Sequence, residues 1–185
     1  KRVEPLNDKM KGSFLGPEFS QEEIEKNLIQ IGANFDIFNE ELIIEKTAEC
    51  ISNGDAVGWF QGRMEFGPRA LGGRSILGDP RSSSMQKNLN LKVKFRESFR
   101  PFAPSVLKED THKWFNINCE SPYMLLVANI NDELKIEMSE EEKNLFGIEK
   151  LNIPRSKIPA VTHVDYSSRI QTVKKETNKR YYKLI

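Results

Sequence analysis

The sequence has few of the side chains that bind metals or form disulfides. Its 185 residues include two histidines and two cysteines, so a histidine-rich metal centre cannot be built from this chain alone. Cys50 and Cys119 lie far apart and lack the CxxC spacing of redox and zinc motifs. We therefore expect no metal ligands in this chain, and two buried free thiols in the reducing environment of the cytoplasm.

Long apolar runs are also lacking, which argues against a membrane partner. The most apolar run is YMLLVANI at 123–130, far shorter than the ~20 residues that span a bilayer. Hydrophobic residues make up 38% of the chain and charged residues 30%, which is typical of a globular domain with a charged surface. The length of 185 residues predicts a single domain.

Positive charge is plentiful but confined to one part of the chain. The net charge of the whole chain is +1, whereas the window 61–100 holds nine basic and three acidic residues, a net charge of +6. Five glycines are interleaved with these cations, and glycine lets backbone N–H groups approach a ligand closely. Arginine guanidinium groups beside unpaired backbone N–H groups suit the bidentate binding of phosphate or carboxylate. The window therefore predicts an anion site for a phosphorylated small molecule.

Apolar periodicity predicts alternating helices and strands, which is typical of an α/β fold. Ser20 and Glu23 form a capping box at the start of the first helix, which Gly32 ends. Further helices are expected at 40–52, 79–91 and 110–115, and strands at 56–60, 75–77, 102–107, 123–130, 158–164 and 168–173. The run 123–130 is the expected central strand, and Trp59 and Phe60 are expected in the core.

Two segments of the basic window are expected to shape the anion site. Residues 67–72 predict a tight turn or a single helical turn, whose free N–H groups would face an anion. Residues 92–100 predict a loop or strand, in which alternation would place Lys94 and Arg96 side by side. Further along, acidic residues dominate 131–157, and we expect a mobile, solvated excursion there.

Three ordered motifs give the sequence a family resemblance. GRMEFGPRALGGRSIL, LNLKVKFRESFRPFAPSV and PAVTHVDYSSRIQTV, preceded by FLGPEFSQEEIEKNL, resemble the C-terminal region of the O-carbamoyltransferases of antibiotic and nodulation-factor biosynthesis. The resemblance implies a YrdC-like fold over 1–185: a twisted mixed α/β sheet with flanking helices and a concave basic surface. It also implies that the chain is a domain fragment, without the N-terminal kinase-like domain and the closing segment of such an enzyme.

The resemblance implies a reaction as well. In the family, this region uses ATP and carbamoyl phosphate to make a carbamoyl-adenylate, and the metal-binding kinase-like domain then transfers the carbamoyl group to a substrate hydroxyl. Such a site must supply fixed cations, because charge builds on the phosphoryl oxygens. We therefore assign catalytic roles to Lys94, Arg96 and Arg69. The expected substrate-binding residues are Arg63, Arg69, Arg74, Lys94, Arg96, Arg100, His163 and Arg169.

Several roles stay open on the sequence alone. Glu65 and Glu97 would orient these arginines, hold Mg²⁺ with the phosphates of ATP, or be ordinary paired carboxylates. His163 would contact a phosphate or carbamoyl oxygen, or be a buried core histidine. The basic window also allows an RNA-binding module or a non-catalytic regulatory domain of the same fold. The cations lack the interleaved stacking aromatics of a single-strand platform, which argues against a nucleic-acid partner.

Overall fold

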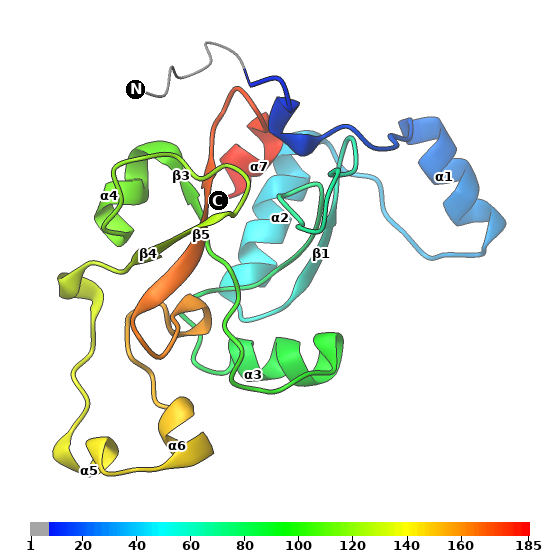
Figure 1. Cartoon of the computed structure of the whole chain (residues 1–185). Helices are drawn as coiled ribbons and strands as arrows, with labels where there is room; N and C mark the ends of the chain where they lie inside the picture. Colours follow the sequence, from blue (N-terminus) through cyan, green and yellow to red (C-terminus); the bar gives the residue numbers. More distant parts are fainter. Residues whose placement is uncertain (1–7) are drawn as a thin grey trace.

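The computed structural model describes residues 8–185 as an α/β domain with two small sheets (Figure 1). In the first sheet β1 pairs antiparallel with β2, and in the second the strand order is β3-β5-β4. β3 runs parallel to β5 and β4 runs antiparallel to it. The strands are β1 (Val57–Phe60), β2 (Arg74–Leu77), β3 (Ser105–Leu107), β4 (Leu126–Asn129) and β5 (Ser167–Val173). The predicted α/β class is confirmed, and the larger sheet is mixed as expected.

The helices are short, and α1, α2 and α4 begin within one residue of the starts that the sequence predicts. Ser20 accepts the expected capping hydrogen bond from a backbone N–H group at the start of α1, and Asn39 accepts one at the start of α2. The helices are α1 (Gln21–Gln30), α2 (Glu40–Ser52), α3 (Met85–Leu89), α4 (Thr111–Trp114), α5 (Glu140–Lys143), α6 (Gly147–Leu151) and α7 (Lys179–Leu184). No helix within 8–185 is long and apolar enough to cross a membrane.

β5, and not the run 123–130, is the centre of the larger sheet. Ile170 in β5 is fully buried, and Phe115 and Ile130 pack in the same core cluster. β4 lies at the sheet edge, where Leu126 and Val127 stay 41% and 62% exposed. The expectation of a central strand at 123–130 was wrong, because apolar content does not record how many neighbours a strand acquires in the fold.

A second core cluster joins the two sheets through the C-terminal helix. Trp59 of β1, Val173 of β5 and Tyr181 of α7 pack together, and Trp59 is buried as predicted. Phe60 is 57% exposed, so its assignment to the core was wrong. Alternation along β1 turns these two neighbouring aromatic side chains to opposite faces of a sheet that is covered on one face only.

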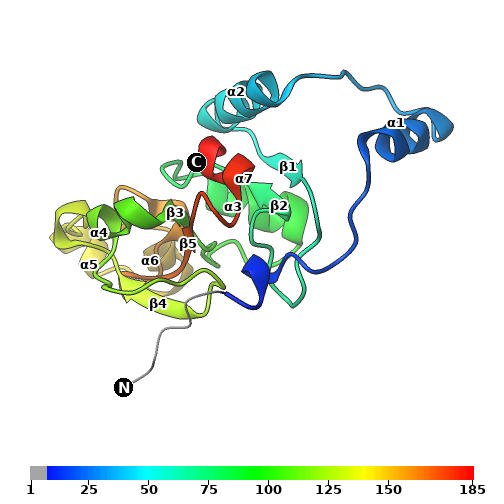
Figure 2. The same cartoon turned by 90° about the horizontal axis from the view of Figure 1, so that it is seen from above.

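Helix α1 projects away from the rest of the domain, as Figures 1 and 2 show. None of its residues is buried, and Ile29 and Ile31 are 69% and 76% exposed. The capping box forms because it depends only on residues within the first turn. The expected burial of the apolar face does not follow, since burial depends on a partner surface.

Three further expectations were wrong. The helix predicted at 79–91 begins later, as α3 at Met85, because the Asp79 carboxylate accepts hydrogen bonds from the backbone and side chain of Arg81 and caps no helix. Residues 158–164 form a 3-10 turn at Pro159–Val161, because proline lacks the N–H that a strand ladder needs. Cys50 and Cys119 are free but exposed.

Residues 131–157, which are rich in acidic side chains, leave the sheet as an excursion that carries α5 and α6 (Figure 1). Its base is closed by backbone hydrogen bonds from Ile136 N to Arg155 O at 2.8 Å and from Lys157 N to Leu134 O at 2.9 Å. The guanidinium of Arg155 is buried against carbonyl oxygens of its own segment. The end of the excursion therefore has a fixed shape, and it returns the chain to the sheet beside α3.

Candidate anion-binding site

Cationic side chains from two distant parts of the chain line one large cavity. It has a volume of about 560 Å³, and its walls come from residues 96–103 and from residues 161–169 beside the edge strand β4. This volume falls within the range of small-molecule sites. Four of the predicted site residues line it, namely Arg96, Arg100, His163 and Arg169.

Arg169 is the centre of the positive charge at this cavity. It lies on β5 opposite Val127 of β4, on the face of the sheet away from the buried Ile170. Partial burial lowers the pKa of the Arg169 guanidinium, and the positive charges of Arg69 and Arg96 lower that pKa further. Arg169 is therefore near enough to both Arg69 and Arg96 for their positive charges to act on it.

Two of these three guanidinium groups have no partner among residues 8–185. The structure shows neither a hydrogen bond nor an ion pair from the side chain of Arg69 or from that of Arg169. Repulsion between cations that lack a counter-ion costs stability. An anion bound between these two arginines and Arg96 would relieve that cost.

Arg96 is held in place by a buried asparagine. Its Nε donates a 2.6 Å hydrogen bond to Oδ1 of Asn90, and its guanidinium lies 4.8 Å from the ring centroid of Phe102. Asn90 is fully buried, and its side-chain amide also donates to the carbonyl oxygens of Ser98 and Arg100. Asn90 is thus a positioning residue that the sequence analysis missed, although it lies within the motif LNLKVKFRESFRPFAPSV.

Lys94 and Arg96 do not share the face that alternation predicts. Residues Asn90–Lys94 form a π-helical turn, and Phe95 ends it in the left-handed conformation with φ 49°. A strand is therefore excluded at this point, and the alternation of side chains with it. Lys94 is exposed, and it does not belong to the described residues that line the cavity.

Arg63 and Arg74 bind the chain itself. The two terminal nitrogens of Arg74 donate to backbone carbonyl oxygens of Gln61, Gly62, Pro17 and Gly73 at 2.8–3.5 Å. Its guanidinium also stacks on the ring of Phe60, 3.4 Å from the centroid. Arg63 contacts the Gly16 carbonyl and pairs with Glu18. Both arginines hold the N-terminal segment, and neither lines the cavity.

Glu65 organises the turn that carries Arg69. Its buried Oε1 accepts hydrogen bonds from the backbone N–H groups of Leu71, Gly73 and Arg74 at 2.7, 2.6 and 3.2 Å. These N–H groups are therefore not available to an external anion. Residues 67–72 contain no helical turn, and the segment follows a series of bends.

The same turn is fastened to the central strand. Gln171 of β5 donates from Nε2 to the Leu71 carbonyl at 2.8 Å. Gly72 has φ 102° and touches the ring of Tyr181, so closely that an added Cβ would lie 2.4 Å from a ring carbon. β5 thus carries Arg169 and, two residues further along, holds the Arg69 turn through Gln171.

His163 and Asp165 form the exposed rim of the cavity. Asp165 Oδ1 accepts hydrogen bonds from the backbone N–H and hydroxyl of Ser167 at 3.0 and 2.6 Å, and lies 3.1 Å from Nδ1 of His163. His163 is exposed and is not a core histidine. Glu97 pairs with Arg100 at 3.2 Å. No group of three or more metal-ligating side chains gathers within residues 8–185.

Asp165 gives a pH-dependent test of this rim. The hydrogen bonds from Ser167, with a smaller contribution from His163, lower the pKa of the Asp165 carboxyl to about 2. The carboxylate therefore stabilises the fold above its unfolded pKa of about 3.9, and this contribution is lost as the pH falls towards 2. In an NMR titration, Ser167→Ala should move the midpoint of Asp165 up towards 3.8. An unchanged midpoint would mean that these hydrogen bonds do not form in solution.

The family described as "Carbamoyltransferase C-terminus" matches residues 48–185. The chain belongs to this carbamoyltransferase family. All the residues that line the cavity, together with Arg69 and Asn90, fall within the matched range.

The relatives of this carbamoyltransferase domain are much longer proteins. An uncharacterised protein of Synechocystis sp. is 58% identical over 180 residues, which cover 96% of this chain and 29% of the relative. Nodulation protein NolNO of Sinorhizobium fredii is 38% identical over 182 residues, covering 96% and 24%. A 3′-hydroxymethylcephem-O-carbamoyltransferase of Streptomyces clavuligerus is 37% identical over 138 residues, covering 75% and 22%. The chain therefore spans less than a third of the length of each.

Proposed function

We propose that this domain binds ATP and carbamoyl phosphate and forms a carbamoyl-adenylate for an O-carbamoyltransferase. The supporting observation is that Arg96 and Arg169 line the large cavity and that Arg69 lies near enough to Arg169 to affect its charge, while Arg69 and Arg169 have no partner among residues 8–185. Such a cluster is poised for a ligand with several negative charges. Both ATP and carbamoyl phosphate are ligands of that kind.

The proposed reaction needs cations and no side-chain nucleophile. Carbamoyl phosphate is first hydrolysed by water, which breaks its acyl phosphate linkage and releases inorganic phosphate and carbamate. A carbamate oxygen then attacks the α-phosphorus of ATP. The bond from the α-phosphorus to the bridging oxygen breaks, and pyrophosphate leaves with its electron pair. Negative charge builds on the phosphoryl oxygens during this displacement, where fixed guanidinium groups stabilise it. Arg96, held by Asn90 and Phe102, and the neighbouring Arg69 and Arg169 are assigned this role.

The cavity suits a nucleotide better than a small inorganic anion. Apolar side chains of Phe102, Ala103, Val127 and Val161 line it beside the arginines. Val127 is 62% exposed although it lies on a strand. The sugar of a nucleotide, which lies next to its phosphates, would cover this surface and gain the corresponding hydrophobic contribution. Mg²⁺ would enter with the phosphates of ATP, since Glu65 and Glu97 already bind other groups of the chain.

The transfer step is assigned to another part of the longer protein. The cephem relative is named an O-carbamoyltransferase, and its match to this chain covers 22% of its length. We propose that a kinase-like domain of the full enzyme receives the carbamoyl-adenylate and passes the carbamoyl group to a hydroxyl. The domain described here would then activate the carbamoyl group without completing the transfer to an alcohol.

Isothermal titration calorimetry tests the proposed ligands. We expect the chain to bind ATP or carbamoyl phosphate at sub-millimolar concentration. Arg69→Ala and Arg96→Ala should each weaken binding at least tenfold, or about 1.4 kcal/mol. Equal binding by the variants and the unmodified chain would place the site elsewhere. Tight binding of an oligonucleotide that weakens steeply with salt would favour an RNA-binding module instead.

A further inference from the structure

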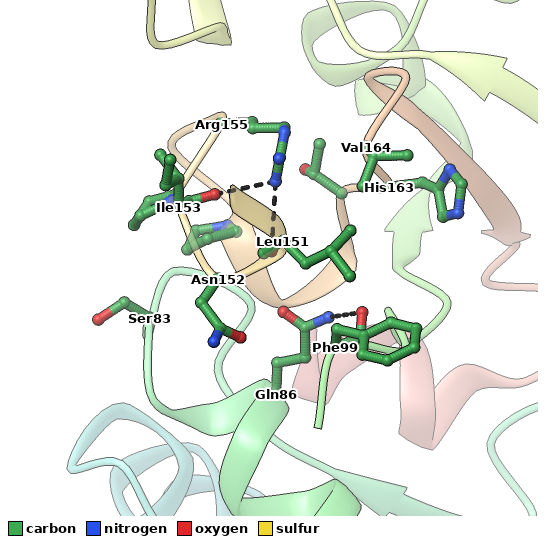
Figure 3. A pocket seen from close by; sticks show the side chains of 12 residues that line it. Ser83, Gln86, Phe99, Leu151, Asn152, Ile153, Arg155, His163 and Val164 are labelled. Atoms are coloured by element: carbon green, nitrogen blue, oxygen red, sulfur yellow. Dashed lines mark hydrogen bonds between the residues drawn. The ribbon is translucent and has the colours of Figure 1, made fainter. Parts of the chain in front are cut away.

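A second, smaller cavity adjoins the arginine-lined one. It has a volume of about 110 Å³ and lies between the end of the acidic excursion at 151–155 and the start of α3. His163 lines both cavities, and the consecutive residues Phe99 and Arg100 line one cavity each. The two spaces are thus neighbours across His163. Figure 3 shows the side chains around the smaller one.

The smaller cavity presents no cation to a ligand, although an arginine is among its lining residues. Arg155 is 7% exposed, and its guanidinium donates to the carbonyl oxygens of Lys150, Leu151 and Ile153. Figure 3 shows it turned back towards its own segment. This contrasts with the larger cavity, where the lining residue Arg169 has no such partner among residues 8–185.

Neutral hydrogen-bonding groups and flat apolar surfaces make up the remaining wall. The side chains of Asn152 and Ser83 have no hydrogen-bond partner among residues 8–185. Gln86 donates from Nε2 to the Phe99 carbonyl at 2.6 Å, which leaves its Oε1 as an acceptor. In Figure 3 the Asn152 amide reaches from the excursion towards Gln86. Apolar contacts are available from Phe99, Leu151, Ile153, Pro154, Pro159 and Val164.

We propose that this smaller cavity is the subsite for the heterocyclic base of the nucleotide whose phosphates bind the arginine cluster. The inference rests on the proposed function and adds a second site to it. A nucleobase is neutral, planar and apolar on its faces, and it has donors and acceptors along its edge. Those properties match the side-chain amides and apolar surfaces here. The volume of 110 Å³ is too small for a whole nucleotide, since ligand sites span ~300–1,000 Å³.

The proposal gives the acidic excursion a place in ligand binding. Residues 151–155 are held by the buried Arg155 and by the closed base of the excursion, so Asn152 is presented by a fixed segment. A side chain on a backbone segment that is already ordered needs only its own rotamer fixed when a ligand arrives, so less conformational entropy is lost. Base recognition would therefore depend on a segment outside the basic window.

Calorimetry with two probes tests this subsite. ATP carries both the base and the phosphates, whereas inorganic tripolyphosphate carries the phosphate charge alone. We expect the unmodified chain to bind ATP at least tenfold more tightly than tripolyphosphate. Asn152→Ala should weaken ATP binding at least fivefold and leave tripolyphosphate binding unchanged, which also shows that the variant is folded. Asn144→Ala, an exposed asparagine of the same excursion that does not line either cavity, is the matched control.

The outcomes separate this inference from the proposed function. Equal affinity of the unmodified chain for ATP and tripolyphosphate would overturn the base subsite while leaving the phosphate site intact. The base subsite would also be overturned if Asn152→Ala weakened the binding of ATP and of tripolyphosphate equally, or changed neither. Loss of carbamoyl phosphate binding in Asn152→Ala, with ATP binding retained, would assign the cavity to the carbamoyl group and overturn the inference. If the unmodified chain binds no probe, the proposed function fails and the subsite fails with it.

Discussion

Arg169→Glu is expected to weaken ATP binding by this chain at least a hundredfold. The substitution removes a guanidinium that interacts electrostatically with Arg69 and Arg96 and puts a carboxylate in its place. The new carboxylate would pair with the remaining arginines and repel the phosphates. A hundredfold loss corresponds to about 2.8 kcal/mol, a reasonable size for reversing one charge in a partly desolvated cluster. Calorimetry at low ionic strength, where screening is weak, measures the effect.

Lys87→Glu is the matched control for this charge reversal. Lys87 is exposed on α3, lies within the same basic window, and has no hydrogen-bond or ion-pair partner among residues 8–185. It lines neither cavity. Its reversal should change ATP affinity less than threefold, because only long-range charge is altered. If Arg169→Glu binds ATP as well as Lys87→Glu does, the arginine cluster is not the phosphate site.

Glu65→Ala is expected to lower the free energy of unfolding by about 3 kcal/mol or more. The Glu65 carboxylate accepts from three backbone N–H groups of the turn that carries Arg69, and it is 6% exposed. Each buried N–H left without an acceptor costs about 1–3 kcal/mol. That loss is a large share of the total stability of a domain, about 5–15 kcal/mol. Urea denaturation monitored by circular dichroism gives the change.

Two other variants identify the cause of such a loss. Glu65→Gln keeps an acceptor oxygen of nearly the same shape, so it should lose less stability than Glu65→Ala. Glu18→Ala removes an exposed carboxylate that pairs with Arg63, and exposed pairs contribute about 0–1 kcal/mol. A Glu65→Ala protein within 1 kcal/mol of the unmodified chain would show that other groups satisfy the turn.

Local signals predicted the parts of the fold that depend on neighbouring residues. Ser20 and Glu23 form the predicted capping box of α1, and α2 spans Glu40–Ser52 as predicted. Features that depend on distant segments were not predictable in this way. β5 is central because β3 and β4 both pair with it, and the sequence of Ser167–Val173 does not record those partners. The uncovered face of α1 has the same cause.

For the site, too, the sequence identified candidate residues but not the contacts that they make in the fold. Charge and family resemblance indicated Arg96, Arg100 and Arg169, which the structure brings to one cavity with His163. They could not separate these from Arg74, whose guanidinium binds backbone carbonyls. A cation in a basic window can face a ligand or the backbone, and only the three-dimensional path of residues 61–74 decides between them.

The hydrogen bonds of Asn90 have a consequence for the energetics of recognition. One buried side chain joins the backbone at 98 and 100 to the guanidinium of Arg96, so this loop takes its shape when the protein folds. The entropy of ordering residues 96–100 is therefore lost during folding and not at the arrival of a nucleotide. More of the attraction between guanidinium and phosphate is then available as net affinity.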